Sequence, residues 1–168
     1  MKARLAMNPI LRWSLPLLGL VFSGCLAALP GRQSLTAEQA CLISTKQALP
    51  ITIEVARTSA ERSSGLMGRE TLAESAGMLF VYSNECSADH SFWMYQTLIP
   101  LDIAYLDREG TIRAIRQMDP CRSDQGRNCP TYEAGVPFNL ALEMNQGYFE
   151  ENRLTIGDRL SLNASDCR

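Results

Sequence analysis

The sequence predicts a mainly β fold: a single compact β-sandwich or small barrel with one or two short helices. Two observations support this prediction. Between residues 50 and 163, short runs alternate apolar and polar side chains, which is the pattern of half-buried strands. Residues that favour turns, mainly Gly, Pro, Asn and Asp, separate these runs at close intervals. The stretch holds about 115 residues, a common size for one domain.

The individual elements follow from these runs in chain order. Strands are expected at residues 51–55, 78–82, 92–95, 101–105, 111–118, 138–144 and 159–163. Thr58 or Ser59 can cap a short helix, and a helical turn is expected at 148–152. Residues 107–110 have the composition of a hairpin turn that ends on glycine.

Residues 1–24 are predicted to be a signal peptide of the lipoprotein type. Lys2, Arg4 and Arg12 give this segment a positive start. The apolar run at 15–22 is shorter than the roughly 20 residues that cross a bilayer, so a signal peptide fits better than a membrane span. We therefore expect the protein to be exported.

The segment Phe22-Ser23-Gly24-Cys25 resembles the lipobox of bacterial lipoproteins, in which the cysteine becomes the lipidated first residue. We expect lipidation of Cys25 and anchoring to a membrane of the cell envelope, on its periplasmic or extracellular face. Ordinary secretion, with Cys25 unmodified, is the alternative. Residues 25–49 lack sustained periodicity and would form a tether to a domain at 50–168.

Cysteines of an exported chain form disulfides more often than they bind metal. Cys121 and Cys129 enclose a short polar loop, so their pairing costs little loop entropy. Cys41 and Cys167 flank the folded region, and a bond between them would hold both ends. Cys86 is then left over, either free or paired with a cysteine from one of these two pairs.

No metal or cofactor is expected. The chain has no Cys-x-x-Cys spacing, and His90 is its only histidine. The serines lack the Gly-x-Ser-x-Gly setting of an activated nucleophile, so no catalytic residue is assigned.

The charge balance argues against nucleic acid as a partner. The chain holds 16 basic and 18 acidic residues. Loss of Lys2, Arg4 and Arg12 with the signal peptide leaves 16 − 3 = 13 basic residues against 18 acidic ones, a net charge of −5. Nucleic acids and anionic lipids both present phosphate groups, and binding them needs a basic surface. Any membrane contact is therefore expected through the lipid anchor.

Asp102 lies in a block rich in aromatic and apolar residues, 91–107. An unpaired carboxylate in an apolar interior is costly, so Asp102 must be hydrogen-bonded, paired with a cation or retained for a function. Arg69 is the expected partner, through a bidentate contact. We favour a structural pair that fixes the short helix onto the sheet; a ligand-binding arginine beside a general base is the functional alternative.

Alternation along the strand at 92–95 places Trp93 and Tyr95 on one face, and Phe92 and Met94 on the other. One face belongs to the core. The other could line a groove for sugar rings or apolar side chains, although packing is the commoner use of such aromatic residues. The candidate ligand-binding residues are Arg69, Trp93, Thr97, Asp102 and Tyr132.

A cluster of acids is a competing arrangement. Asp102 could combine with Asp119 or Glu143, and two carboxyls roughly 5 to 10 Å apart would suit glycosidic chemistry. For Glu143 alone, a solvated strand face is the simpler expectation.

Four ordered motifs carry a resemblance to a known family: Gly65-Leu66-Met67-Gly68-Arg69, Gly77-Met78-Leu79-Phe80-Val81, Phe92-Trp93-Met94, and Thr97-Leu98-Ile99-Pro100-Leu101-Asp102-Ile103. The chain resembles the exported bacterial and archaeal family called domain of unknown function 192, over about residues 50–163. The resemblance implies a mainly β single domain and no particular reaction. The chain departs from the family pattern at Tyr95-Gln96, where members often have Lys-Asn.

The leading functional hypothesis is a lipid-anchored, exported module that binds envelope glycan or peptide without transforming it. Two alternatives stand beside it. One is a hydrolase of envelope glycan that uses Asp102 and a second carboxylate. The other is an accessory subunit of a membrane complex.

Overall fold

The fold was determined as a computed structural model, which describes residues 35–122 and 124–168. The predicted signal peptide (1–24) and the predicted lipidation site, Cys25, lie outside these residues. Within the described residues, no helix is both long and apolar enough to cross a membrane.

The described residues form nine strands, two short α-helices and two 3₁₀ helices. In chain order these are β1 (Ala37–Ile43), β2 (Ala48–Ala56), α1 (Ser59–Ser64), β3 (Ala76–Cys86), β4 (Ser91–Trp93), β5 (Leu101–Leu106), β6 (Ile112–Met118), η1 (Gly126–Asn128), β7 (Thr131–Glu133), β8 (Phe138–Asn145), α2 (Tyr148–Glu151), β9 (Arg159–Ser161) and η2 (Ala164–Cys167). The predicted mainly β fold with one or two short helices is confirmed.

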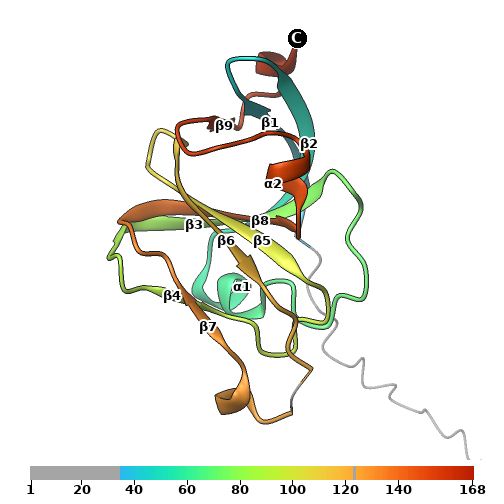
Figure 1. The fold of residues 1–168 in the computed structure, drawn as a ribbon, viewed down its shortest axis with the longest axis vertical. Helices are drawn as coiled ribbons and strands as arrows, with labels where there is room; N and C mark the ends of the chain where they lie inside the picture. Colours follow the sequence, from blue (N-terminus) through green and yellow to red (C-terminus); the bar gives the residue numbers. More distant parts are fainter. Residues whose placement is uncertain (1–34, 123) are drawn as a thin grey trace, which may run out of the picture. The chain divides into compact units, whose positions relative to one another are not determined.

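Seven strands form one sheet in the order β6-β5-β8-β3-β2-β1-β9, and β4 pairs with β7 in a small second sheet. The large sheet curls into a half-barrel (Figure 1). β2 and β3 run parallel, and the chain between them contains α1. The other strand pairs are antiparallel.

The two edges of the curled sheet approach each other at one end, where β9 meets the turn before β6. Ile112 N donates a hydrogen bond to Asp158 O (2.8 Å), and Leu160 N donates to Gly110 O (2.8 Å). Gly110 has φ +85°, and a Cβ atom there would lie 2.4 Å from Leu160 O. Glycine is therefore required at this position for two reasons: the left-handed backbone and the close approach of β9.

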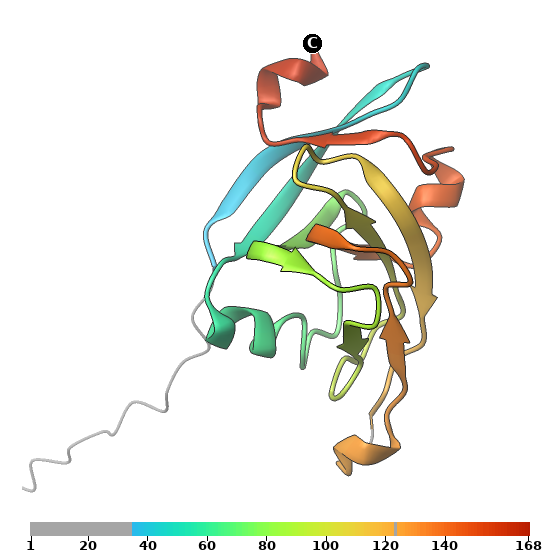
Figure 2. The same cartoon turned by 90° about the vertical axis from the view of Figure 1, so that its left-hand side faces the viewer.

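Strand alternation gives the large sheet two buried faces. On one face, which we call the packed face, Ala104 and Leu106 of β5 contact a core that includes Tyr148 and Phe149 of α2. On the other, the cavity face, Ile103 and Tyr105 belong to a second core that includes Leu66, Phe92 and Met94. Figures 1 and 2 show α2 on one side of the sheet, and α1 with the β4–β7 pair on the opposite side.

The predicted boundary between tether and domain was wrong for residues 37–49. This segment contains β1 and the start of β2, and β1 lies between β2 and β9 in the large sheet. Ala40, Cys41 and Leu42 are at most 1% exposed. The run of consecutive apolar residues did not show the period of two that marks a strand, because both faces of β1 are covered in this region.

Two disulfides close the chain, Cys41–Cys167 and Cys121–Cys129. They join the same cysteines that the sequence predicts. Cys86 is the free cysteine among the described residues and is partly buried. Disulfides persist in oxidising compartments, so these two bonds indicate an oxidising, exported location.

Candidate functional site

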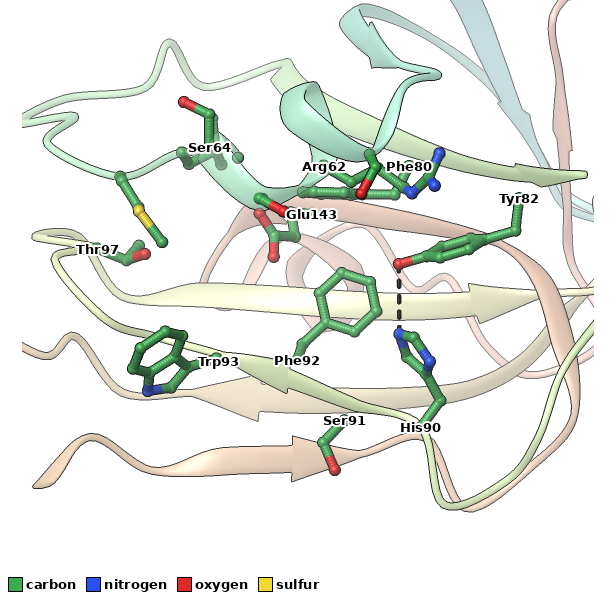
Figure 3. A pocket seen from close by; sticks show the side chains of 15 residues that line it. Arg62, Ser64, Phe80, Tyr82, His90, Ser91, Phe92, Trp93, Thr97 and Glu143 are labelled. Carbon is green, nitrogen blue, oxygen red and sulfur yellow. Dashed lines mark hydrogen bonds between the residues drawn. The ribbon is translucent and has the colours of Figure 1, made fainter. Parts of the chain in front are cut away.

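A cavity of about 430 Å³ opens on the cavity face of the large sheet. Helix α1 and the loop after it form one wall, strands β3 and β8 form the floor, and β4 with the residues around it forms the opposite wall (Figure 3). The lining residues are Ser59, Arg62, Ser63, Ser64, Gly65, Leu66, Met67, Phe80, Tyr82, His90, Ser91, Phe92, Trp93, Thr97 and Glu143. Its size lies within the usual range of small-molecule sites.

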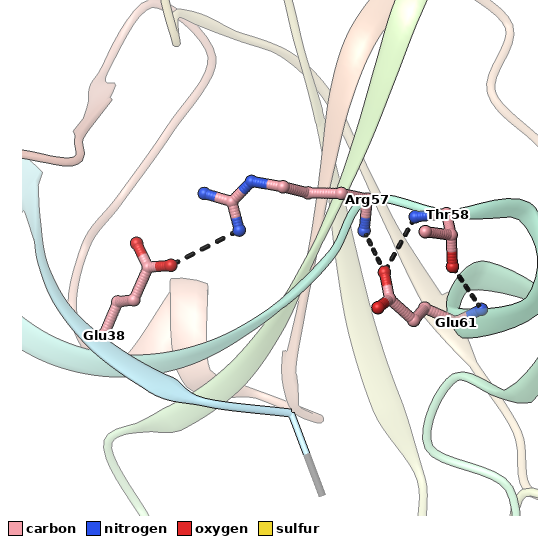
Figure 4. Close-up of polar contacts among 4 residues, drawn as sticks. All are labelled: Glu38, Arg57, Thr58 and Glu61. Atoms are coloured by element: carbon pink, nitrogen blue, oxygen red, sulfur yellow. Dashed lines mark hydrogen bonds and ion pairs between the residues drawn. The ribbon is translucent and has the colours of Figure 1, made fainter. Parts of the chain in front are cut away.

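Helix α1 is fixed in place by its first turn (Figure 4). The Thr58 hydroxyl accepts a hydrogen bond from Glu61 N (3.2 Å), and the Glu61 carboxylate accepts from Thr58 N (2.7 Å). This reciprocal capping box confirms Thr58 as one of the two predicted caps. Arg57 forms an ion pair with Glu38 of β1 (3.3 Å), so the start of the helix is also held to the large sheet.

Glu143 of β8 stands on the floor of the cavity. In register it pairs with Met78 of β3 and Ile103 of β5, both of which belong to the core of the cavity face. The residue is 6% exposed. Figure 3 shows its carboxyl directed into the space between α1 and Phe92.

The Glu143 carboxyl has no charge partner that would keep it ionised. The hydrogen bonds and ion pairs among the described residues include none to this carboxyl. Burial raises the pKa of Glu143 from 4.5 to about 8. The group is therefore a neutral carboxylic acid at pH 7, and it presents one O–H donor and one carbonyl acceptor to the cavity.

Aromatic side chains form the apolar part of the cavity. Phe80 of β3 and Phe92 of β4 meet edge to face with their ring centroids 5.2 Å apart. Leu66, in the loop after α1, is 2% exposed and belongs to the opposite wall from Phe92. These side chains leave a surface that favours an uncharged, partly apolar ligand.

At one end of the cavity, Arg62 and His90 approach the ring of Tyr82. The guanidinium carbon of Arg62 lies 4.7 Å from the centroid of that ring, and its Nη1 donates to the backbone carbonyls of Arg57 (2.6 Å) and Val81 (3.0 Å). The Tyr82 hydroxyl and His90 Nε2 are 3.4 Å apart. Burial lowers the pKa of His90 and raises that of Tyr82 to about 12, so both are neutral at pH 7.

Hydroxyl groups gather at the other end. Ser63 and Ser64 come from α1, and Thr97, which is 5% exposed, follows β4. The hydrogen bonds among the described residues include none made by these three hydroxyls. They are thus available to a ligand, both as donors and as acceptors.

Trp93 lies at the rim and is 46% exposed. Its ring stacks on Tyr95 with centroids 4.8 Å apart, and its Nε1 donates to Gly126 O (3.2 Å). A Cβ atom at Gly126 would lie 2.3 Å from the Trp93 ring. The loop closed by the Cys121–Cys129 bond therefore supports the rim of the cavity directly.

Of the five candidate binding residues, Trp93 and Thr97 line the cavity, whereas Arg69, Asp102 and Tyr132 do not. Tyr132 of β7 supports the chain near the disulfide loop instead, since its hydroxyl accepts a hydrogen bond from Asp119 N (2.8 Å). This contact lies outside the cavity lining.

The predicted pair of Arg69 and Asp102 was wrong. Arg69 Nη2 instead contacts both carboxylate oxygens of Glu54 at 2.6 Å. Glu54 pairs in register with Met78 on the cavity face, whereas Asp102 pairs with Met144, which belongs to the packed face. The two residues of the predicted pair thus lie on opposite sides of one sheet.

Asp102 is buried, as the sequence predicts, and is 2% exposed. Its Oδ2 accepts a hydrogen bond from Gly147 N (3.0 Å), at the turn between β8 and α2. Its Oδ1 has no hydrogen-bond partner among the described residues. Burial raises the pKa of Asp102. The role shown by these contacts is to hold the turn that places α2 on the packed face.

The expectation of a solvated face for Glu143 was also wrong. Phe138, Leu140, Leu142 and Met144 do alternate as predicted, which leaves Glu143 on the other face of β8. That face is covered by α1 and β4, so it is a second interior face. The sequence did contain one sign that this face is buried: Ala141 and Glu143 lie in a strand that is apolar at most other positions.

The acidic cluster considered from the sequence does not form around Asp102 and Glu143, because they lie on opposite faces of the sheet. Among the described residues that line the cavity, Glu143 is the only carboxylic acid. A glycosidase of the usual kind needs two acids that face the same bond.

The chain was compared with known proteins. The profile of the DUF192 family, described as "Uncharacterized ACR", matches residues 29–162. No match was found among curated proteins.

Two solved structures have the same fold. One, from Sinorhizobium meliloti 1021, is described as a candidate transcription regulator. It is 30% identical with a TM-score of 0.69, and the match covers 78% of this chain and 97% of that one. The other, a protein of unknown function from Novosphingobium aromaticivorans DSM 12444, is 27% identical with a TM-score of 0.66 and coverage of 80% and 91%. Because the family match spans most of the sequence, the chain belongs to the DUF192 family.

Proposed function

We propose that this protein is an exported binding module whose cavity accepts one small, uncharged unit of an envelope glycan. The observation that carries the proposal is the neutral Glu143 on the floor of a cavity that combines aromatic walls with unused hydroxyls. A sugar ring presents apolar C–H faces and a rim of hydroxyl groups. Phe80, Phe92 and Trp93 supply aromatic surface for the faces, and Ser64 and Thr97 supply hydrogen bonds for the rim.

The charge of the possible ligands favours a glycan over a peptide that binds by its terminus. A free amino acid or a peptide terminus brings a full charge, and a buried charge needs a partner. The acid on the cavity floor is neutral at pH 7, and the guanidinium of Arg62 already donates to two backbone carbonyls. Peptide binding is therefore the alternative that the calorimetric experiment below must distinguish from glycan binding.

Binding is favoured over hydrolysis, because the described part of the cavity lining contributes a single carboxylic acid. The S. meliloti structure is described as a candidate transcription regulator, a role that the charge of this chain does not favour. With the predicted signal peptide removed, the chain has 13 basic against 18 acidic residues, which does not suit a phosphate backbone.

Export is supported by the two disulfides. We further propose that a lipid on Cys25 holds the domain at a membrane surface, a proposal that rests on the lipobox-like segment. Mass spectrometry of the protein recovered from its membrane fraction tests it: a lipid-modified Cys25 at the N-terminus supports the anchor, and an unmodified N-terminus contradicts it.

Isothermal titration calorimetry tests the binding proposal directly. The disulfide-bonded protein is titrated with the β-1,4 disaccharide of N-acetylglucosamine, with cellobiose and with tri-alanine. We expect saturable binding of a disaccharide and none of tri-alanine. Binding of tri-alanine alone, or of none of the three probes, would contradict the proposal.

A matched pair of variants locates the binding. Thr97→Val removes a hydroxyl that faces the cavity while keeping the shape of the side chain. Thr111→Val makes the same change beside β9, away from the cavity lining. We expect disaccharide binding to weaken about tenfold in the first variant, the size of one lost hydrogen bond, and to stay unchanged in the second. Equal affinities in both variants would place the ligand elsewhere.

A further inference from the structure

We infer that Glu143 is the residue by which the cavity selects its ligand: its O–H donates to a carbonyl oxygen, so that the preferred unit is an N-acylated sugar. This inference rests on the proposed function and names the substrate class more closely. The Glu143 side chain is 6% exposed and is directed into the cavity (Figure 3). An O–H group in that place can donate to a ligand in the cavity.

The groups that face Glu143 from the neighbouring elements do not compete for this hydrogen bond. Tyr105 of β5 uses its hydroxyl to donate to Tyr132 O (3.1 Å). Tyr82 of β3 has its hydroxyl beside His90 Nε2 (3.4 Å). Arg62 of α1 donates to two backbone carbonyls. His90 lines the same cavity, and Arg116 of β6, which is next to Ile103 in register, donates to Ala134 O (3.2 Å). Among the described residues, none of these side chains forms an ion pair with Glu143.

A neutral acid differs from a carboxylate in what it recognises. A carboxylate only accepts, so it binds the hydroxyl groups of any sugar. A neutral acid also carries a donor, and an amide carbonyl is a stronger acceptor for it than the hydroxyl and ring oxygens of a plain sugar. The O–H of Glu143 therefore favours ligands that bring a carbonyl group.

The surroundings of Glu143 suit the rest of an N-acyl group. In a trans amide the N–H points away from the carbonyl, so a second acceptor is needed, and the hydroxyls of Ser64 and Thr97 lie in the same cavity. The methyl end of an acetyl group is apolar, and Leu66, Phe80 and Phe92 provide apolar surface. An acetamido sugar therefore matches both the polar and the apolar parts of the lining.

The test compares the acetylated disaccharide with cellobiose, which has hydroxyls in place of the acetamido groups. We expect the disulfide-bonded protein to bind the acetylated sugar at least about tenfold more tightly at pH 6. The affinity should then fall as the pH rises through about 8, where the Glu143 proton is lost, by about tenfold per pH unit above it. Cellobiose binding should show no such fall.

Three variants separate this role from a structural one. Glu143→Gln keeps a donor and an acceptor but cannot ionise, so it should retain the preference at pH 6 and lose the pH dependence. Glu143→Leu should remove the preference. Asp102→Asn makes the same acid-to-amide change on the packed face and should leave both properties unchanged. If Glu143→Leu does not fold, the pH profile of Glu143→Gln still decides.

The outcomes distinguish the inference from the function on which it rests. Equal affinity for the two disaccharides, or a pH profile that is the same in wild type and Glu143→Gln, would overturn the inference and leave the binding module standing. Absence of binding for both disaccharides would overturn both.

Discussion

The two faces of the seven-stranded sheet each bury one carboxylic acid, but they treat it differently. Asp102 on the packed face is 2% exposed and is held by the backbone N–H of Gly147. Glu143 on the cavity face is 6% exposed and faces a cavity of about 430 Å³. The comparison teaches that burial of an acid does not by itself mark a site. What distinguishes Glu143 is open space in front of a buried polar group.

The same contrast applies to the apolar residues of the two faces. Phe149 of α2 is 2% exposed and is not among the residues that line the cavity, whereas Phe92 borders it. Phe149→Ala should lower the free energy of unfolding by about 4 kcal/mol, and Phe92→Ala by less, because Phe92 makes fewer contacts on its open side. Urea unfolding measures both. A larger loss for Phe92→Ala would mean that the cavity face is the more tightly packed one.

Glu143→Gln is expected to have the next largest effect, in the opposite direction. The pKa is 4.5 for the ordinary group and about 8 in the folded protein, so the unfolded state ionises first and stability falls as the pH rises from about 4.5 to 8. Each pKa unit is worth about 1.4 kcal/mol, so removal of the titrating group should stabilise the protein by about 3 kcal/mol at pH 7.

Thermal unfolding at pH 5, 7 and 8 checks this prediction. The gap between Glu143→Gln and the wild type should be small at pH 5 and should widen with pH. A constant gap would show that the Glu143 carboxyl does not titrate in this range.

Asp102→Asn should change stability by less than about 1 kcal/mol. The asparagine oxygen can still accept from Gly147 N, and loss of the acid removes the penalty that burial places on its charged form. Because burial raises the pKa of Asp102, the small stabilisation should appear as the pH rises through the shifted value. A loss of several kcal/mol in urea unfolding would instead show that the charge itself holds the β8–α2 turn.

Gly126→Ala tests the rim of the cavity and should change the fold only locally. The added methyl group must displace the Trp93 ring, which lies 2.3 Å from the position of that Cβ atom. We expect a shift in Trp93 fluorescence and weaker disaccharide binding, with a stability loss of about 1 kcal/mol. Unchanged fluorescence would mean that the disulfide loop moves instead of the tryptophan.

Much of the fold could be predicted from the sequence, because local patterns determine it. The period of two along β2, β5 and β8, the Thr58 cap and the turn at residues 107–110 are all properties of neighbouring residues. Strand β7 was not predicted, since it has three residues and follows a disulfide loop.

The site could be predicted only in part, because it depends on which face of the sheet each residue occupies. Trp93 and Thr97 were identified from their local setting and do line the cavity. Arg69 was predicted to pair with Asp102. The strand register instead places Glu54 on the cavity face, where it pairs with Arg69. Glu143 was expected on a solvated face, because its cover by α1 and β4 cannot be seen from the strand alone.

The most direct test of this account is an NMR titration of the Glu143 side-chain carboxyl carbon, assigned by its loss in Glu143→Gln. We predict a single transition centred near pH 8 in the free protein, which moves to higher pH when the acetylated disaccharide is bound. A transition near pH 4.5, unaffected by the sugar, would contradict it.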